Sequence, residues 1–99
     1  MKRKKCYISG KITGLNVIAY TTKFKASERL VSILGYAPIN PLEHGLGEGH
    51  LWATYMFFDI IIMLRCRAIF FQKDWRDSKG ARIEYRIAKI LRLKMYFER

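Results

Sequence analysis

The sequence predicts an α/β fold, in which short strands alternate along the chain with longer helices. Four short β-prone runs are separated by longer stretches, which have apolar residues at three- and four-residue steps or throughout. Gly, Pro and Asn stand at the junctions, where turns are needed. A chain of 99 residues suffices for one core, so we expect residues 1–99 to form a single domain.

In the first half of the chain, each predicted element ends at a residue that disfavours its continuation. Gly10 follows the first strand, Gly35 is placed to end the first helix, and Asn40-Pro41 stops the second strand. The segment after Pro41 is rich in glycine and polar residues, which is typical of a loop. The predicted elements are a strand at 6–9, a loop at 10–14, a helix at 19–34, a strand at 36–39 and a loop at 42–50.

The second half opens with a predicted helix that is apolar on almost every side, with Asp59 as its only charged residue before Leu64. Such a helix is buried in a protein core or in a subunit interface. Ser78 suits the N-cap position of the last helix, whose polar and apolar residues separate on a helical wheel. The predicted elements are a helix at 51–64, a strand at 68–72, a loop at 73–77, a helix at 79–93 and a final strand at 94–97.

This order of elements predicts a parallel sheet, because a helix between two strands brings them side by side in the same direction. We expect a flavodoxin-like or Rossmann-like three-layer sandwich around a short sheet of four or five strands. Ligands bind such folds beyond the carboxyl ends of the strands. The loops at 10–14, 40–41 and 73–78 follow those ends and should surround one cleft.

The composition indicates the class of partner and the compartment. A formal net charge of +11 favours anionic partners such as nucleotides or nucleic acid. Cys6 and Cys66 stand in no metal-binding pattern, so we expect two reduced thiols in a cytoplasmic protein. The longest apolar stretch, at 52–64, is too short to span a bilayer and contains Asp59, so no membrane partner is expected.

Two carboxylates stand where a charge is costly. Glu84 lies on the edge of the apolar half of the last predicted helix, and Asp59 interrupts the apolar helix. One interpretation is structural: Glu84 pairs with Arg or Lys at a rim, and Asp59 bonds to backbone or to a Tyr hydroxyl. The other is a catalytic pair for glycosyl chemistry, in which one carboxylate attacks the anomeric carbon and the other handles a proton.

Two further segments suggest ligands. Ser78-Lys79-Gly80 opens the last helix, where exposed N–H groups and the helix dipole suit an anion such as phosphate. Two histidines and two glutamates in the Gly-rich segment are residue types that bind metals, but their spacing fits no zinc pattern. We interpret that segment as a mobile lid over the cleft and expect neither a metal nor a cofactor. The four residues are His44, His50, Glu43 and Glu48.

Four short motifs follow one another along nearly the whole chain. They are YISGKITG at 7–14, GYAPINP at 35–41, Asp59 followed by LRCRAI at 64–69, and WRDSKGARIE at 75–84. Each motif is weak alone, but the ordered set resembles the nucleoside 2-deoxyribosyltransferase-like superfamily. It is most similar to a small, uncharacterised bacterial and phage subgroup related to deoxynucleoside 5′-monophosphate N-glycosidases.

The resemblance implies roles for particular residues. It puts Glu84 at the position of the family's nucleophilic Glu and Asp59 at that of its sugar- or proton-handling Asp. Ser78 aligns with a serine that contacts phosphate, and Trp75 is placed either to stack on a base or to serve the structure alone. The other expected substrate-binding residues are Tyr7, Ser9, Gly10, Ile12, Asn40 and Gly80.

We therefore expect hydrolysis or deoxyribosyl transfer at the N-glycosidic bond of a nucleoside or nucleoside 5′-monophosphate, with basic neighbours keeping the Glu84 nucleophile ionised. Two alternatives remain: a nucleotide-binding sensor or sequestering module without turnover, and a nucleic-acid-binding protein that uses its basic surface. The apolar helix at 51–64 also predicts a homodimer or higher homo-oligomer that buries part of it, and the resemblance implies the same.

Overall fold

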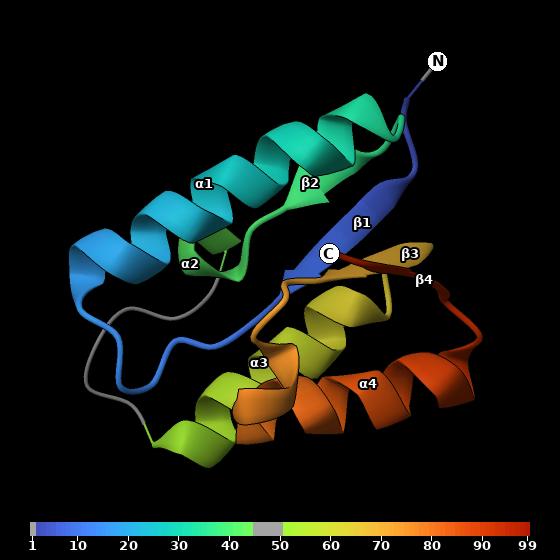
Figure 1. Ribbon diagram of the computed structural model, residues 1–99. Coiled ribbons are helices and arrows are strands. Elements are labelled where there is room, and N and C mark those ends of the chain that lie inside the picture. The colour runs from blue at the N-terminus through green and yellow to red at the C-terminus, as the bar shows by residue number, and fades with distance from the viewer. Residues whose placement is uncertain (1, 45–50) are drawn as a thin grey trace.

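The computed structural model describes residues 2–44 and 51–99 (Figure 1). Within these residues, four strands form one sheet of order β2-β1-β3-β4, and every neighbouring pair runs parallel. The predicted α/β fold with a four-stranded parallel sheet is therefore confirmed. The elements are β1 (Lys5–Ser9), α1 (Val17–Ile33), β2 (Ala37–Ile39), α2 (Pro41–His44), α3 (Trp52–Met63), β3 (Ala68–Phe71), the 3-10 helix η1 (Trp75–Asp77), α4 (Lys79–Leu91) and β4 (Lys94–Phe97).

Helices cover both faces of the sheet, with α1 on one side and α3 and α4 on the other (Figure 1). The central strands β1 and β3 are buried throughout except at Lys5, and their successive side chains point to opposite faces. Two cores result, one on each face. The core beneath α1 contains Cys6, Ile8, Phe24, Val31, Ala68 and Phe70, and the core beneath α3 and α4 contains Tyr7, Met63, Cys66, Ile69, Phe71 and Ala88.

Capping residues explain where the helices differ from the predicted ranges. Helix α1 begins two residues early because the side chain of Asn16 accepts a hydrogen bond of 2.8 Å from the Ala19 N–H. Gly35 follows its end with a φ of +99°, as a helix-ending glycine should. Helix α4 ends at Leu91 because Arg92 turns into the left-handed region, with a φ of 58°.

The predicted loop at 42–50 is wrong at its start, because residues 41–44 form α2. Proline is favourable at a first helical position, where its missing N–H costs nothing. Asn40 caps this turn, because its side-chain oxygen accepts a hydrogen bond of 2.9 Å from the Leu42 N–H. The side-chain amide of Asn40 donates a hydrogen bond of 2.9 Å to the Glu28 carboxylate. The rest of the predicted loop, at 45–50, and with it the expected lid, lies outside the described residues. The predicted loop at 73–77 also contains a short helical turn, η1.

Helix α3 is only partly covered by the domain. Met56 and Met63 are buried, whereas Phe57 keeps 62% of its surface exposed. None of the described helices combines the length and the apolar character that crossing a bilayer requires. One side of α3 therefore presents apolar surface outside the core. Its exposed apolar residues, with those that flank it, are Leu51, Trp52, Phe57, Phe58, Ile61 and Leu64.

Candidate functional site

A cavity of about 1250 Å³ lies at the carboxyl end of the sheet. Its walls come from the end of β1, the segments after β1 and β2, one face each of α1 and α3, and the first turns of α4. This volume exceeds the roughly 300–1,000 Å³ of most small-molecule sites, so a nucleotide-sized ligand fits. The structure brings nine of the ten expected site residues to its walls. They are Tyr7, Ser9, Gly10, Ile12, Asn40, Asp59, Ser78, Gly80 and Glu84.

Glu84 is the most deeply placed carboxylate of this cavity, with 5% of its surface exposed. Its two oxygens accept hydrogen bonds from the Tyr7 hydroxyl at 2.8 Å and from the Ser9 hydroxyl at 2.7 Å. Tyr7 and Ser9 are two residues apart on β1, so both side chains point to the face that α4 covers. The alternation of the strand thus places two donors on one carboxylate.

Asp59 joins this group from α3 and couples to Glu84. Burial raises the pKa of Asp59 to about 6, although hydrogen bonds to Glu84 and Tyr7 lower it. Burial and then the charge of Asp59 raise the pKa of Glu84 to about 8, against the lowering effect of the Ser9 and Tyr7 hydroxyls. Two interacting carboxyls titrate as a unit, so at neutral pH the pair holds about one proton.

No cation contacts the Glu84 carboxylate among the described residues. The expectation that basic neighbours keep this group ionised is therefore wrong, and its pKa moves in the opposite direction. Three of the four cations that line the cavity are engaged elsewhere: Lys25 pairs with Glu43, Arg82 donates to the Arg76 carbonyl at 2.7 Å, and Lys79 lies over the Trp52 ring. The structural alternative of a Glu84 rim ion pair is excluded as well.

A polar network holds the loop that follows β1. The Lys23 ammonium donates to the Gln72 side chain at 2.6 Å and to Asp74 at 2.7 Å, and Asp74 accepts the Lys11 N–H at 3.1 Å. A Cβ atom at Gly10 would lie 1.9 Å from the Gln72 amide oxygen. A side chain at residue 10 would therefore displace the Gln72 amide from this network, which holds the loop at the cavity wall.

The start of α4 combines a cap with close helix packing. The Ser78 hydroxyl accepts the Ala81 N–H at 3.2 Å, which confirms the predicted N-cap. Its own hydrogen remains available to donate to a ligand in the cavity. A Cβ at Gly80 would come within 3.1 Å of the Met56 sulfur, so this glycine lets α3 and α4 approach.

Trp75 is the expected site residue that the structure places elsewhere. It does not line the cavity but lies in an aromatic cluster, with ring centroids 5.0 Å from Phe71, 4.9 Å from Tyr85 and 5.8 Å from Phe97. The base-stacking role is therefore wrong, and the structural alternative holds. The reason is the short turn η1, which directs this side chain to the outer part of the sheet.

The sequence interpretation overlooked two aromatic side chains and a methionine on α3. Trp52, Tyr55 and Met56 line the cavity beside Asp59. Their steps of three and four residues place them on one helical face with the carboxylate, a signal the sequence contained. Within residues 2–44 and 51–99, no group of three or more potential ligand residues could hold a metal ion. Two residues of the alternative metal site lie outside these ranges.

Residues 4–97 match the family described as Domain of unknown function (DUF4406). The chain belongs to this family. The match spans all four strands and every residue that lines the cavity at the carboxyl end of the sheet. The description assigns DUF4406 no activity, and no curated protein is significantly similar to this chain.

Proposed function

We propose that this protein cleaves the N-glycosidic bond of a nucleoside 5′-monophosphate, or transfers its deoxyribosyl group, with Glu84 as nucleophile. One observation carries the proposal: a buried carboxyl, held by two hydroxyl donors and coupled to a second carboxyl, lines a nucleotide-sized cavity. Retaining glycoside cleavage requires such a pair, because one group attacks carbon while the other handles a proton.

The first step uses the minor form of the pair, in which the shared proton has moved from Glu84, the group with the higher pKa, to Asp59 and leaves Glu84 ionised. The Glu84 carboxylate attacks the anomeric carbon, and a C–O bond forms as the C–N bond breaks. Asp59 gives its proton to the departing base nitrogen. The Tyr7 and Ser9 hydroxyls donate to Glu84 and fix the direction of its oxygens, at 2.8 and 2.7 Å.

In the second step, water attacks the anomeric carbon of the Glu84 ester. Asp59, now a carboxylate, accepts the water proton, and the C–O bond to Glu84 breaks with its electron pair returning to the carboxylate. A second base in place of water completes deoxyribosyl transfer. The pair then again holds one proton, so each turnover leaves the protein unchanged.

The walls of the cavity suit the rest of a nucleotide. Trp52 and Tyr55 offer aromatic surface for a base, and the Ser78 hydroxyl at the start of α4 offers a donor to a phosphate. Lys79 lies over the Trp52 ring, with its ammonium 4.8 Å from the ring centroid, and adds positive charge at the same wall. These features favour the 5′-monophosphate over the uncharged nucleoside.

The decisive experiment incubates the protein with a panel of nucleosides and their 5′-monophosphates and detects free base by chromatography. We expect base release by the wild type, and a loss of on the order of a hundredfold or more in Glu84→Gln, the scale of a lost catalytic carboxylate. Tyr96→Phe, outside the cavity, is the matched control. Equal rates in the wild type and Glu84→Gln would exclude the nucleophile assignment.

The raised pKa of Glu84 favours one second candidate, a nucleotide-binding module without turnover. A protonated Glu84 donates a hydrogen bond to a ligand but does not attack carbon. Binding of a monophosphate in calorimetry, without base release on long incubation, would support this function and exclude the first.

We place the protein in the cytoplasm on the basis of its thiols. Cys6 and Cys66 are both free and buried, and burial raises their pKa values to about 12 and about 11. Free rather than disulfide-bonded cysteines are typical of a reducing compartment.

A further inference from the structure

A second pocket, of about 630 Å³, lies at the opposite end of the sheet. The four strands begin there, and the residue just before each strand belongs to its wall. These residues are Tyr36, Lys4, Arg67 and Leu93, in the order of the strands across the sheet. We call this surface the amino-edge pocket. Its lining residues are Lys4, Tyr36, Met63, Leu64, Arg65, Cys66, Arg67, Leu91, Arg92, Leu93 and Lys94.

The amino-edge pocket is strongly cationic. Five of its residues carry a positive charge, and none of its lining residues is acidic. Within residues 2–44 and 51–99, none of the five cations has a carboxylate within ion-pair distance. All five are exposed. The five cations are Lys4, Arg65, Arg67, Arg92 and Lys94.

The helix dipoles at this edge do not neutralise the positive charge of the five cations. The carboxyl ends of α1, α3 and α4 lie at this edge, and each carries about half a negative charge, or about −1.5 in total. Five cations exceed this by more than three charges. Surplus charge without a partner attracts anions from solution.

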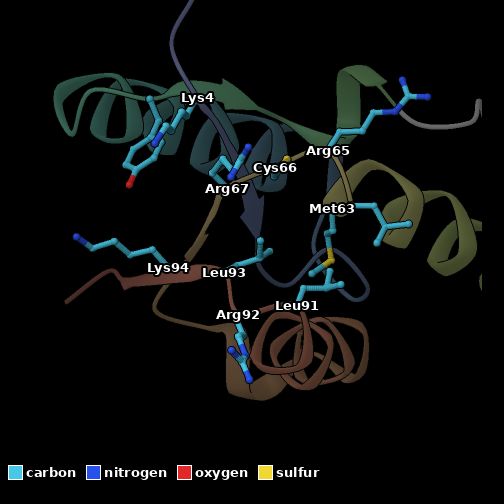
Figure 2. A pocket seen from close by; sticks show the side chains of 11 residues that line it. Lys4, Met63, Arg65, Cys66, Arg67, Leu91, Arg92, Leu93 and Lys94 are labelled. Atoms are coloured by element: carbon cyan, nitrogen blue, oxygen red, sulfur yellow. The ribbon is translucent and has the colours of Figure 1, made fainter.

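Three of the five cations lie in a row. The Lys94 N–H donates to the Arg67 carbonyl at 3.2 Å, and the Arg67 N–H donates to the Lys5 carbonyl at 2.9 Å, so these strand starts are side by side. Neighbouring strands lie about 4.8 Å apart, so the backbones of these strand starts are one strand spacing from each other. Figure 2 shows Lys4, Arg67 and Arg92 following one another across the pocket, while Arg65 and Lys94 extend to opposite sides. A row of charges fits a chain of phosphates better than a single phosphate.

Arg92 provides a second observation. It occupies the left-handed region, with a φ of 58°, at a helix end where glycine is usual. This backbone costs a residue with a Cβ about 1 kcal/mol or more relative to glycine. The sequence thus keeps a cation at a position where the backbone favours glycine.

We propose that the amino-edge pocket binds the backbone of a single-stranded nucleic acid. The row of cations contacts successive phosphates, and the Tyr36 ring, at the β2 end of the row, offers a face for a base. The pocket and the cavity that holds Glu84 share no lining residue, so the proposal does not rest on the proposed function.

The test is fluorescence anisotropy with a labelled 20-nucleotide oligodeoxythymidylate over a range of salt concentrations. The triple variant Arg67→Gln, Arg92→Gly, Lys94→Gln removes three cations, and glycine suits the backbone of residue 92. We expect its affinity at 0.1 M salt to fall about tenfold or more. We also expect the slope of log affinity against log salt to become shallower by about 2, since each phosphate contact contributes about 0.7.

The charge-matched control is the triple variant Arg29→Gln, Lys73→Gln, Arg86→Gln, whose three cations are exposed and line neither pocket. It should retain the affinity within about threefold, and Glu84→Gln should bind as the wild type does. Equal weakening by both triple variants would overturn the proposal, since diffuse charge would then explain the binding. Tighter binding of a duplex, of polyglutamate or of anionic vesicles would also overturn it, as would no binding by the wild type.

Discussion

At the residue scale, the two coupled carboxyls of the cavity determine how stability depends on pH. The folded state raises the pKa of Glu84 from 4.5 to about 8 through burial and the charge of Asp59. The folded protein therefore holds this proton more tightly than the unfolded chain. Its contribution to the unfolding free energy is complete below pH 4.5 and is lost as the pH rises towards about 8.

Replacing Glu84 by Gln should remove this dependence. Because Gln resembles the protonated carboxyl, we expect the variant and the wild type to have similar Tm values at pH 5. Above pH 7 the variant should become the more stable of the two, by several degrees, since about 1 kcal/mol corresponds to roughly 4–8 °C in a domain of this size. Differential scanning fluorimetry from pH 5 to 9 measures the difference, in which the titration of groups outside the Glu84–Asp59 pair cancels. A constant Tm difference across this range would mean that Glu84 does not titrate there.

At the element scale, the start of α4 serves both the fold and the proposed site through one hydroxyl. Ser78 accepts the Ala81 N–H, and its loss in Ser78→Ala should cost about 1 kcal/mol of stability. Ser78→Asp keeps a capping oxygen but adds a negative charge at the expected phosphate position. We expect Ser78→Asp to retain the wild-type Tm but to bind a nucleoside 5′-monophosphate at least about tenfold more weakly, by calorimetry. Equal affinities of Ser78→Asp and the wild type would show that the phosphate does not bind at this wall.

The elements also show what sequence patterns predict well and where they fail. The strands and helices were predictable because burial imposes periods of two and of three to four residues on a chain, and Gly35 and Ser78 mark helix ends by local chemistry. Glu84 and Asp59 were found because isolated carboxylates in apolar helices stand out. The direction of the Trp75 side chain and the pKa of Glu84 were mispredicted, because both depend on packing between segments far apart in sequence.

At the scale of the whole molecule, the uncovered side of α3 predicts self-association. Phe57 and Leu64 are 62% and 61% exposed on a helix that the domain covers only in part. We expect the protein to form a homodimer or higher oligomer that buries this side. Sedimentation equilibrium at micromolar concentration should give at least twice the 11.7 kDa chain mass, and Phe57→Asp should shift the protein to monomer.

The control for this experiment is Ile18→Asp, which introduces the same charge at an exposed apolar residue of α1. It should leave the sedimenting mass unchanged. A wild type that sediments as a monomer, or an equal effect of both substitutions, would argue against an interface on α3.

The direction of the strands has a practical consequence for attaching the protein to other objects. Because all four strands run the same way, the segment before β1 leaves the sheet at the edge where Lys4 lies, at the end opposite the Glu84 cavity. An affinity tag or surface linker fused at the amino terminus therefore shields the basic edge and leaves the carboxyl-edge cavity facing the solution. The same linker that preserves an assay for small ligands would mask an assay for nucleic acid, so tests of the two proposed sites call for differently tethered proteins.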